Sequence, residues 1–372
     1  MRRNGVVIVG AGLSGLYAAA LLTRSGVACT VLEARARIGG RILSRAPNLA
    51  SAACYDLGPA WFWPDMQPRL RRLIGALGLE AFVQHSEGAV LVERFRLEPP
   101  QRYERGFNTE PRSMRLLGGM ATLADAVAAM LPPGCVQCGV QVTALHGDGA
   151  GPVEIDAVGP DGTRKIMADT VILALPPRLA AGQIAFSPAL PSRLRGALEA
   201  VPTWMAGQAK VLAVYEDAFW KAQGLSGMVS SFVGPLGEVH DASAPDGHPA
   251  LFGFVGLPAA ARAALGAEGM KQQALAQFVR LFGPRAAQPL AVYLQDWALE
   301  PCTATPADGQ AAGGHPTYGP PPPFEGPWLG RVVFAGTEAA LEHGGYLEGA
   351  LEAAEAAVKE IAERATLDRM AG

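Results

Sequence analysis

The first residues whose spacing indicates a binding role are three glycines in a GxGxxG motif: Gly10, Gly12 and Gly15. A β-branched run (5–10) leads into them and a stretch with helical periodicity (13–23) follows, which predicts a strand, a turn and a helix. A second predicted strand (28–34) contains Glu33, an acid 18 residues after the third glycine. This arrangement is typical of dinucleotide binding. The first glycine makes the tight turn, the second lets the backbone approach a pyrophosphate, and the third packs the helix on the strand.

The helix that begins at Leu13 and Ser14 points its N-terminus toward the phosphates, and Glu33 can accept hydrogen bonds from a ribose. A glycine-rich turn in an unrelated α/β protein is the competing interpretation. The acid and the second strand fall where the dinucleotide mechanism requires them, so they favour the binding site.

Basic residues and another glycine pair follow the second predicted strand, in the stretch ARARIGGRI (34–42). Positive side chains and exposed backbone suit a long, doubly charged cofactor that lies extended across a sheet. The segment VLEARARIGGRI (31–42) resembles the second FAD signature of the flavin amine oxidase family, the superfamily of monoamine and polyamine oxidases. Three more segments resemble landmarks of that family in the same order: YDLGPAWFWP (55–64), RLLGGMATLADAVAAML (115–131) and FAGTEAALEHGGYLEGALEAAEAA (334–357).

The resemblance implies FAD as the cofactor and a binding site assembled from these motifs. Its expected members are Gly10, Gly12, Leu13, Ser14, Gly15, Glu33, Ala34, Arg35, Gly39, Gly40, Arg41, Gly58, Pro59, Ala60, Trp61, Val142, Gly336, Glu338, Gly345, Tyr346 and Leu347. Monoamine oxidases of the mammalian type attach FAD through a cysteine nine residues beyond a tryptophan that matches Trp297. Pro306 stands at that position here and Cys302 is out of register, so we expect FAD to bind without a covalent link.

The resemblance also implies three catalytic residues. Lys210, in the apolar run AGQAKVLAVY, matches a lysine that holds a water beside the flavin N5. Trp297 matches the tryptophan that packs by the flavin ring, and Tyr346 matches a wall of the substrate cage. Without the resemblance, the simplest interpretation of Lys210 is an edge-strand lysine that reaches solvent. The simplest interpretation of Tyr346 is an aromatic residue that packs at the start of a helix.

The second aromatic wall of the cage is missing at its usual place, where the chain has Ala307. A Gly- and Pro-rich stretch (307–327) follows, and His315, Tyr318 and Phe324 are candidates to replace the wall. The four prolines of this stretch could also offer a polyproline ligand to a partner, although a stiff surface loop is the simpler interpretation.

The composition excludes several classes of protein. The chain has 372 residues, 49% of them hydrophobic and 17% charged, and its net charge of −3 gives no support to nucleic-acid binding. We expect no membrane anchor, because no apolar run reaches the ~18–20 residues of a membrane span. We also expect no signal peptide, because the apolar run near the N-terminus carries glycines at fixed spacing and no cleavage-type end. Five cysteines form no even framework, which favours the cytoplasm. The CxxC at Cys135 and Cys138 reads as strand-entry cysteines rather than a redox or metal motif, and the six histidines predict no metal site.

We therefore expect an α/β protein in which a Rossmann-like FAD-binding domain carries a substrate domain of mixed sheet and helices. The FAD-binding domain is expected to be discontinuous (1–82, 113–183 and 328–372), with residues 83–112 and 184–327 forming the substrate domain. Only about thirty residues lie between LGLEAFV and RLLGGM, where the family commonly inserts a helical lobe, so a more open entrance is expected. The stretch 140–177 predicts a strand meander with Gly-Asp and Asp-Gly turns.

The function implied is oxidation of an amine, in particular a primary amine, to an imine. Water then gives an aldehyde or ketone plus ammonia, and O₂ is reduced to H₂O₂. Two alternatives stay open: a flavin dehydrogenase or desaturase acting on a carotenoid or porphyrinogen, and a non-catalytic flavoprotein. The partners expected are the amine and O₂, and the sequence leaves a homodimer open.

Overall fold

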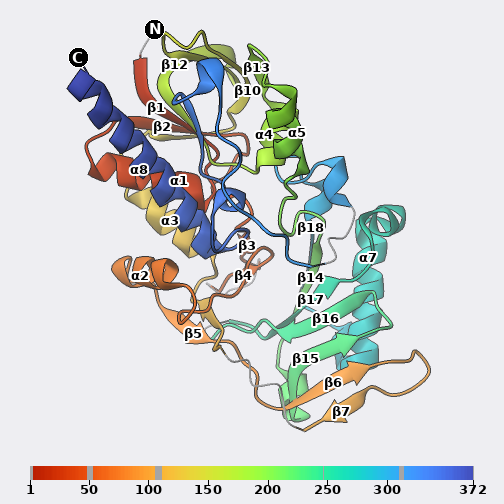
Figure 1. Cartoon of the computed structure of the whole chain (residues 1–372). Helices are drawn as coiled ribbons and strands as arrows, with labels where there is room; N and C mark the ends of the chain where they lie inside the picture. The colour runs from red at the N-terminus through yellow and green to blue at the C-terminus, as the bar shows by residue number, and fades with distance from the viewer. Residues whose placement is uncertain (1–2, 48–52, 105–110, 246, 310–313, 372) are drawn as a thin grey trace.

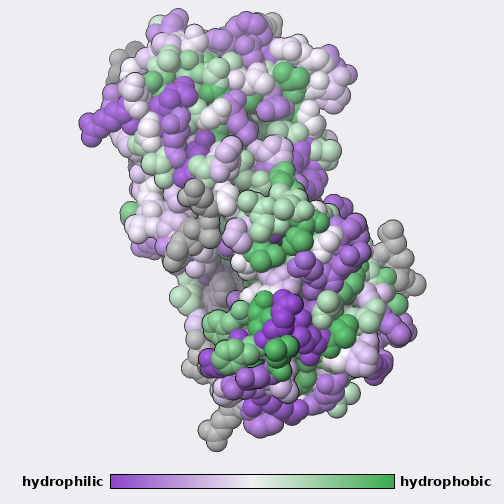
Figure 2. All heavy atoms as spheres, turned by 90° about the vertical axis from the view of Figure 1, so that its right-hand side faces the viewer, coloured by the Kyte–Doolittle hydropathy of each residue, from purple (hydrophilic) through white to green (hydrophobic). Residues whose placement is uncertain are grey.

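The computed structural model describes residues 3–47, 53–104, 111–245, 247–309 and 314–371. Two large sheets dominate it, one near the two termini and one at the opposite end of the molecule (Figure 1). In the part of the chain described, no helix combines the length and apolar character needed to cross a bilayer. On the face that carries α7 (Ala259–Phe282), hydrophobic residues gather in patches among hydrophilic ones, chiefly in its middle and lower parts (Figure 2).

The first sheet is built around β1 (Arg3–Val9), which pairs in parallel with β2 (Cys29–Glu33) and with β12 (Gly162–Leu173). Its strand order is β13-β10-β11-β12-β1-β2-β9, and β19 (Val332–Phe334) pairs in parallel with β12. The other members are β9 (Val136–Cys138), β10 (Gln141–His146), β11 (Val153–Gly159) and β13 (Ala185–Ser187). Because β1 is buried on both faces, its run of valine and isoleucine is continuous rather than alternating.

Helices cover both faces of this sheet. On one face α1 (Leu13–Arg24), α3 (Ala121–Ala129) and α8 (Leu347–Ala371) lie side by side and share one apolar core (Figure 1). On the other face α4 (Pro177–Gln183) and α5 (Ser192–Ala200) pack against the meander of β10, β11 and β12.

The second sheet has the order β18-β14-β17-β16-β15-β6-β7 and is mostly antiparallel. Its strands are β6 (Ala89–Glu93), β7 (Gln101–Tyr103), β14 (Ala209–Val214), β15 (Leu225–Ser231), β16 (Leu236–Asp241), β17 (Ala250–Val255) and β18 (Ala291–Asp296). The long helix α7 packs across it, with a break in helical geometry at Gly266. Strand β14 carries Lys210, which lies opposite Gln295 of β18.

Shorter elements accompany the two sheets. They are β3 (Ser44–Arg45) paired with β4 (Tyr55–Asp56), β5 (Ala81–Val83) paired with β8 (Met114–Leu116), α2 (Pro68–Ala76) and α6 (Phe219–Ala222). Single 3₁₀ turns complete the structure: η1 (Pro284–Ala287), η2 (Trp297–Leu299), η3 (Pro306–Gly309), η4 (Gly326–Trp328) and η5 (Thr337–Ala339).

The α/β architecture with a Rossmann-like unit is confirmed, and so is the meander within 140–177. Both strands within 83–112 lie in the second sheet, whereas β13, just past the expected boundary at 183, lies in the first. The division into two domains stays a prediction.

Candidate active site

A single large cavity collects nearly all the residues that the sequence singled out. It has a volume of about 470 Å³, within the ~300–1,000 Å³ usual for small-molecule sites. Of the expected cofactor and catalytic residues, all except Gly15 and Glu338 line it. Residues more than three hundred positions apart in the chain therefore meet around one space.

The glycine turn has the shape needed to cradle a phosphate. Gly10 has φ +105°, and a Cβ there would press on the carbonyl of Ala174. A Cβ on Gly15 would overlap the carbonyl oxygen of Gly10, so this glycine serves the packing of α1 rather than the cavity. A Cβ on Gly12 would meet nothing within 4 Å, so the backbone faces open space at the helix N-terminus. The residues present thus fit the pyrophosphate of a dinucleotide.

Glu33 is buried and ties the glycine turn to the end of β2. One carboxylate oxygen accepts a hydrogen bond from the amide of Ala11 at 2.7 Å, and the other accepts one from the amide of Arg35 at 2.9 Å. The guanidinium of Arg35 reaches Glu300 at 3.3 Å and the hydroxyl of Thr303 at 2.6 Å. Thr303 also lines the cavity and was not predicted.

Arg41 and Glu338 form an ion pair between the second and the last of the FAD motifs. Two nitrogens of the guanidinium lie 2.6 and 3.1 Å from the carboxylate oxygens. Glu338 is fully buried and does not line the cavity, so it acts here by holding Arg41 rather than by facing a ligand. Both side chains also bond to the backbone of Trp204: Glu338 accepts from its amide at 3.4 Å, and Arg41 donates to its carbonyl at 3.1 Å.

Lys210 is 3% exposed, so the interpretation as an edge-strand lysine reaching solvent is wrong. Its Nζ donates to the carbonyls of Gly58 (2.7 Å) and Asp56 (3.1 Å), and it lies over the ring of Phe252 at 4.3 Å. Burial lowers the pKa of Lys210 to about 7; the nearby Asp56 carboxylate opposes this shift and Arg115 adds to it. A lysine that loses its proton near neutral pH is suited to proton transfer.

Asp56 and Arg115 are two buried charged residues near Lys210 that sequence reasoning did not find. Asp56 accepts from Ser44 at 2.6 Å and from the amide of Met120 at 2.8 Å through one oxygen, and its other oxygen lacks a protein partner. The Nε of Arg115 also lacks one. Burial raises the pKa of Asp56 and lowers that of Arg115. The one available signal was an acid and a base placed inside otherwise apolar motifs.

Trp297 begins the turn after β18 and is 6% exposed. Its indole Nε1 donates to the carbonyl of Leu57 at 3.2 Å, which fixes one ring edge while the ring lines the cavity. Trp61 is held in the same way by Gln84, whose oxygen lies 2.8 Å from the indole nitrogen. These two indoles and Lys210 come from three different motifs and line the same cavity.

Tyr346 lines the cavity and is 38% exposed, and helix α8 begins directly after it. The glycine pair before it makes room for two rings: a Cβ on Gly344 would overlap Tyr318, and one on Gly345 would lie 2.9 Å from the indole of Trp204. This glycine pair therefore serves the packing of the two rings against the chain. The hydroxyl of Tyr318 donates to the carbonyl of Pro202 at 2.9 Å.

The region expected to hold the second aromatic wall is arranged differently from the family pattern. Neither Pro306 nor Ala307 lines the cavity, whereas Cys302 does. Phe324 packs in the apolar core with Phe186 and Phe334, so it is not available as a wall. Burial raises the pKa of the Cys302 thiol, which disfavours the reactive thiolate.

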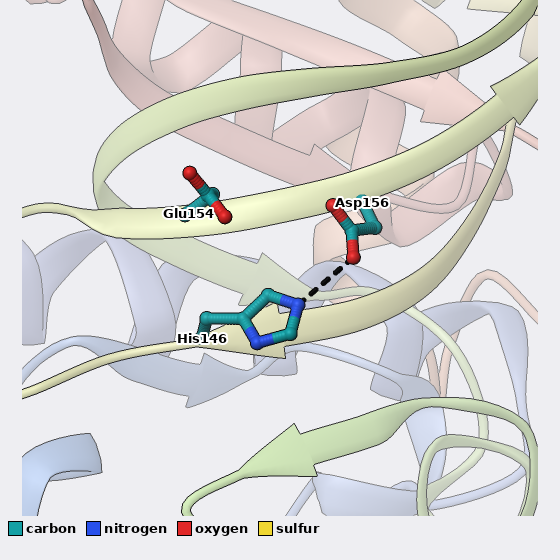
Figure 3. A group of neighbouring side chains, drawn as sticks. All are labelled: His146, Glu154 and Asp156. Carbon is teal, nitrogen blue, oxygen red and sulfur yellow. Dashed lines mark hydrogen bonds and ion pairs between the residues drawn. The ribbon is translucent and has the colours of Figure 1, made fainter.

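Among the residues that the structure describes, two groups of side chains outside the cavity have metal-ligand composition: His146 with Glu154 and Asp156, and Glu342 with His343 and Glu352. In the first, the imidazole lies 2.9 Å from Asp156 across neighbouring strands (Figure 3). The ammonium of Lys165 bonds to Glu154 at 2.5 Å and lies 4.0 Å from Asp156, so it already balances these carboxylates. Three consecutive backbone amides (341–343) donate to Glu352 in the second group. We assign no metal to either.

The CxxC cysteines bracket β9, and neither of them lines the cavity. Cys135 is next to Cys29 rather than paired with Cys138, and its thiol donates to the carbonyl of Cys29 at 3.4 Å. The structure therefore places the CxxC motif at the entry to a strand.

Comparison with known proteins decides the family. The family model described as "Flavin containing amine oxidoreductase" matches residues 101–362, and a model described as "NAD(P)-binding Rossmann-like domain" matches residues 8–77. This chain belongs to the flavin-containing amine oxidoreductase family. As a member it is an enzyme, a flavin-dependent amine oxidase, and its cofactor is FAD.

Relatives of this amine oxidase match along nearly its whole length. "Amine oxidase [flavin-containing] A" of Sus scrofa is 28% identical and covers 96% of this chain and 84% of its own. "Amine oxidase [flavin-containing]" of Danio rerio is 25% identical, with 96% and 85% covered. Among solved structures, putrescine oxidase bound to putrescine gives a TM-score of 0.80 at 24% identity, covering 97% and 99%. Cyclohexylamine oxidase from Brevibacterium oxydans IH-35A gives 0.79 at 22%, covering 98% and 99%. These two structures show the likeness of the fold.

Proposed function

We propose that this amine oxidase converts a primary amine to an imine, which water hydrolyses to an aldehyde or ketone plus ammonia. O₂ takes the electrons and becomes H₂O₂. The observation that carries the proposal is the meeting of Lys210 and Tyr346 on the cavity that also contains the Gly12 phosphate cradle. When bound, FAD supplies the hydride acceptor, and the protein supplies orientation, electrostatics and exclusion of water.

The residues proposed to hold FAD are those of the motifs that line the cavity. Gly10, Gly12 and the start of α1 receive the pyrophosphate, and Glu33 accepts from the adenosine ribose. Arg41 adds positive charge, kept in place by Glu338. We propose non-covalent binding, in agreement with Pro306 at the attachment position and with the protonated state favoured for Cys302.

Lys210 is proposed to hold a water and to exchange a proton with it. The neutral side chain of Lys210 has two N–H donors on Nζ, and two backbone carbonyls already accept hydrogen bonds from Nζ. The lone pair can then take a proton from a water in the cavity. A pKa near 7 makes both states available near neutral pH.

Tyr346 and Trp297 are proposed to shape the space beside the reacting carbon. Tyr346 offers an aromatic face that attracts partial positive charge on the amine nitrogen. The hydrogen bond from Trp297 to Leu57 holds its indole at one orientation, so this wall does not have to be ordered when substrate binds.

An anaerobic titration tests the function. The FAD-loaded protein is mixed without oxygen with putrescine, cyclohexylamine, benzylamine and simple alkylamines, and absorbance near the flavin maximum is followed. Bleaching by a primary amine, with H₂O₂ formed on admitting air, supports the proposal. Bleaching only by a carotenoid or a porphyrinogen would replace it with the desaturase alternative.

The domain division, the cytoplasmic location and a homodimer stay predictions. We propose that the segments of the first sheet form the FAD-binding domain and those of the second sheet the substrate domain, since the cavity is lined by residues of both.

A further inference from the structure

Two cysteines from distant parts of the chain lie together at one end of the first sheet. Cys29 begins β2, and Cys135 directly precedes β9, the strand that pairs in parallel with β2. The Cys135 thiol donates to the carbonyl of Cys29 at 3.4 Å, and the two thiols hydrogen-bond to each other across 106 positions of sequence. The amide of Val31 donates to the carbonyl of Cys135 at 2.8 Å, which keeps the two segments side by side.

Both cysteines border a second hollow of about 460 Å³, and none of the described residues lines both this hollow and the large cavity. Its rim includes the exposed residues Val27, Pro132 and Pro133. Cys29 is itself partly exposed, and Cys135 lies deeper. Because the rim is exposed, a molecule as small as hydrogen peroxide can reach the sulfur atoms from solvent.

The pair has the chemistry of a dithiol that peroxide oxidises. The hydrogen bond from the Cys29 thiol lowers the pKa of Cys135 to about 7, and the same contact raises the pKa of Cys29, so Cys135 ionises first. A thiolate near neutral pH beside a second thiol is typical of cysteines that react with peroxide. Cys138, the other half of the CxxC, lies opposite Glu33 at the far end of β9, and burial raises its pKa.

We propose that Cys29 and Cys135 are a modification site at which hydrogen peroxide forms a reversible disulfide between β2 and the segment before β9. The Cys135 thiolate attacks one peroxide oxygen, the O–O bond breaks, and Cys135 becomes a sulfenic acid as hydroxide leaves. The Cys29 thiol gives its proton to that hydroxide, and its sulfur attacks the Cys135 sulfur. The displaced hydroxide takes up the proton that Cys135 first released. Two thiols thus lose two electrons and two protons, and one peroxide becomes two waters.

This inference goes beyond the proposed function and uses it only as a source of oxidant. An oxidase that reduces O₂ releases peroxide at each turnover, so its own thiols are among the first to meet it. In the cytoplasm, the predicted location, disulfides are transient and sense redox state, and thiol exchange restores the reduced pair. A cross-link between positions 106 apart restricts the unfolded chain, so oxidation should raise the melting temperature.

Added peroxide tests the site without turnover. The FAD-loaded protein is reduced with dithiothreitol, freed of reductant and treated with a small excess of hydrogen peroxide. Free thiols are then blocked with N-ethylmaleimide, and the protein is digested without reductant. Mass spectrometry should find the peptides of Cys29 and Cys135 joined, and dithiothreitol should separate them. The melting temperature should rise on oxidation and fall back on reduction.

Single substitutions separate the two thiols. Cys29→Ser lacks the second thiol, so Cys135 should stop at the sulfenic acid and react with dimedone, which traps that group. Cys135→Ser should leave Cys29 unlabelled. Cys138→Ser is the matched control, because it keeps both members of the pair and should form the link as the parent does. Flavin absorbance confirms that each variant is folded and loaded.

Three results would overturn the proposal. In the first, the peroxide-treated parent keeps both thiols free. In the second, Cys135 is linked to Cys138 rather than to Cys29. In the third, dimedone labels Cys302 as fast as it labels Cys135 in Cys29→Ser, since the pair would then have no special reactivity toward peroxide.

Turnover separates this inference from the function that supplies the oxidant. With an amine and O₂, the reduced protein should form the same link, and added catalase should prevent it. If added peroxide joins the thiols but no amine bleaches the flavin, the modification site stands and amine oxidation fails. If amines are oxidised but neither turnover nor added peroxide joins the thiols, the modification site fails alone.

Discussion

The Nζ of Lys210, on the second sheet, lies 2.7 Å from the carbonyl oxygen of Gly58, in the loop that follows β4. This hydrogen bond joins a strand of one half of the molecule to a cofactor motif of the other. A substitution of Lys210 should therefore affect both proton transfer in the cavity and the position of the loop that contains Gly58.

Lys210→Met should keep FAD bound and slow the reaction. Methionine fills the same apolar space but neither donates to the carbonyls of Gly58 and Asp56 nor exchanges a proton. We expect the rate of flavin reduction by amine, or of its reoxidation by O₂, to fall by about 10²-fold, the lower end for loss of a general acid–base group. Stopped-flow absorbance measures both steps, and rates equal to those of the parent would remove Lys210 from the mechanism.

The pH dependence of stability should report the same lysine. Its pKa is about 7 when folded, against an ordinary value of 10.5, so between these values the unfolded chain binds more protons. The free energy of unfolding therefore gains a contribution that rises with pH from about 7 to about 10.5. Urea unfolding of the FAD-loaded protein at several pH values should show this rise, and Lys210→Met should flatten it. Equal slopes for the two proteins would contradict the assignment.

Alanine substitutions at two glycines of one motif should affect cofactor binding and folding separately. Gly12→Ala meets no protein atom within 4 Å, so the fold should keep its melting temperature while FAD affinity falls at least tenfold. Gly15→Ala overlaps the carbonyl of Gly10 and should lower the melting temperature itself. Thermal unfolding with and without added FAD measures both effects. Tight FAD binding by Gly12→Ala would exclude this turn as the phosphate site.

Glu338→Gln should destabilise the protein although Glu338 itself does not line the cavity. It leaves Arg41 with a neutral partner at a fully buried position, and breaking a buried pair costs about 3–5 kcal/mol. Because Arg41 is partly exposed, we expect the lower part of that range. Urea unfolding gives the loss. A matched change at an exposed pair, Glu363→Gln beside Lys359, should cost less than ~1 kcal/mol.

Denaturation should release the flavin. If FAD is non-covalent, acid precipitation of the protein leaves yellow colour in the supernatant and none in the pellet. Cys302 is the cysteine that lines the cavity, so Cys302→Ser is the companion variant. Colour that stays with the pellet of the parent and is lost from that of Cys302→Ser would show a covalent link through this residue.

The cofactor half of the site could be read from the sequence because its signals are local. Gly10, Gly12 and Glu33 fall within one strand–turn–helix–strand unit, and their spacing predicts dinucleotide binding. The same holds for the apolar strand around Lys210 once the family pattern is seen. Its burial could not be inferred from the run alone, because partners for the ammonium come from the loop after β4.

The substrate-binding part of the site could not be predicted from the sequence in the same way. Trp204 gains its place from Arg41 and Glu338, 163 and 134 residues away, and from the bare backbone of Gly345. No periodicity or motif connects these positions. The departure at Ala307 marks where the family's second ring is missing, and only the assembled fold shows that Trp204 and Tyr346 both contact His315.

The hydroxyl of Ser14, at the start of α1, donates to the carbonyl of Ala335, 321 residues later. The glycine turn is thus made before the segment that completes the cavity beside it has been synthesised. We expect a nascent chain to take up FAD only once that segment has emerged and can meet the turn. A chain arrested before residue 336 would then remain colourless however well its first half had folded.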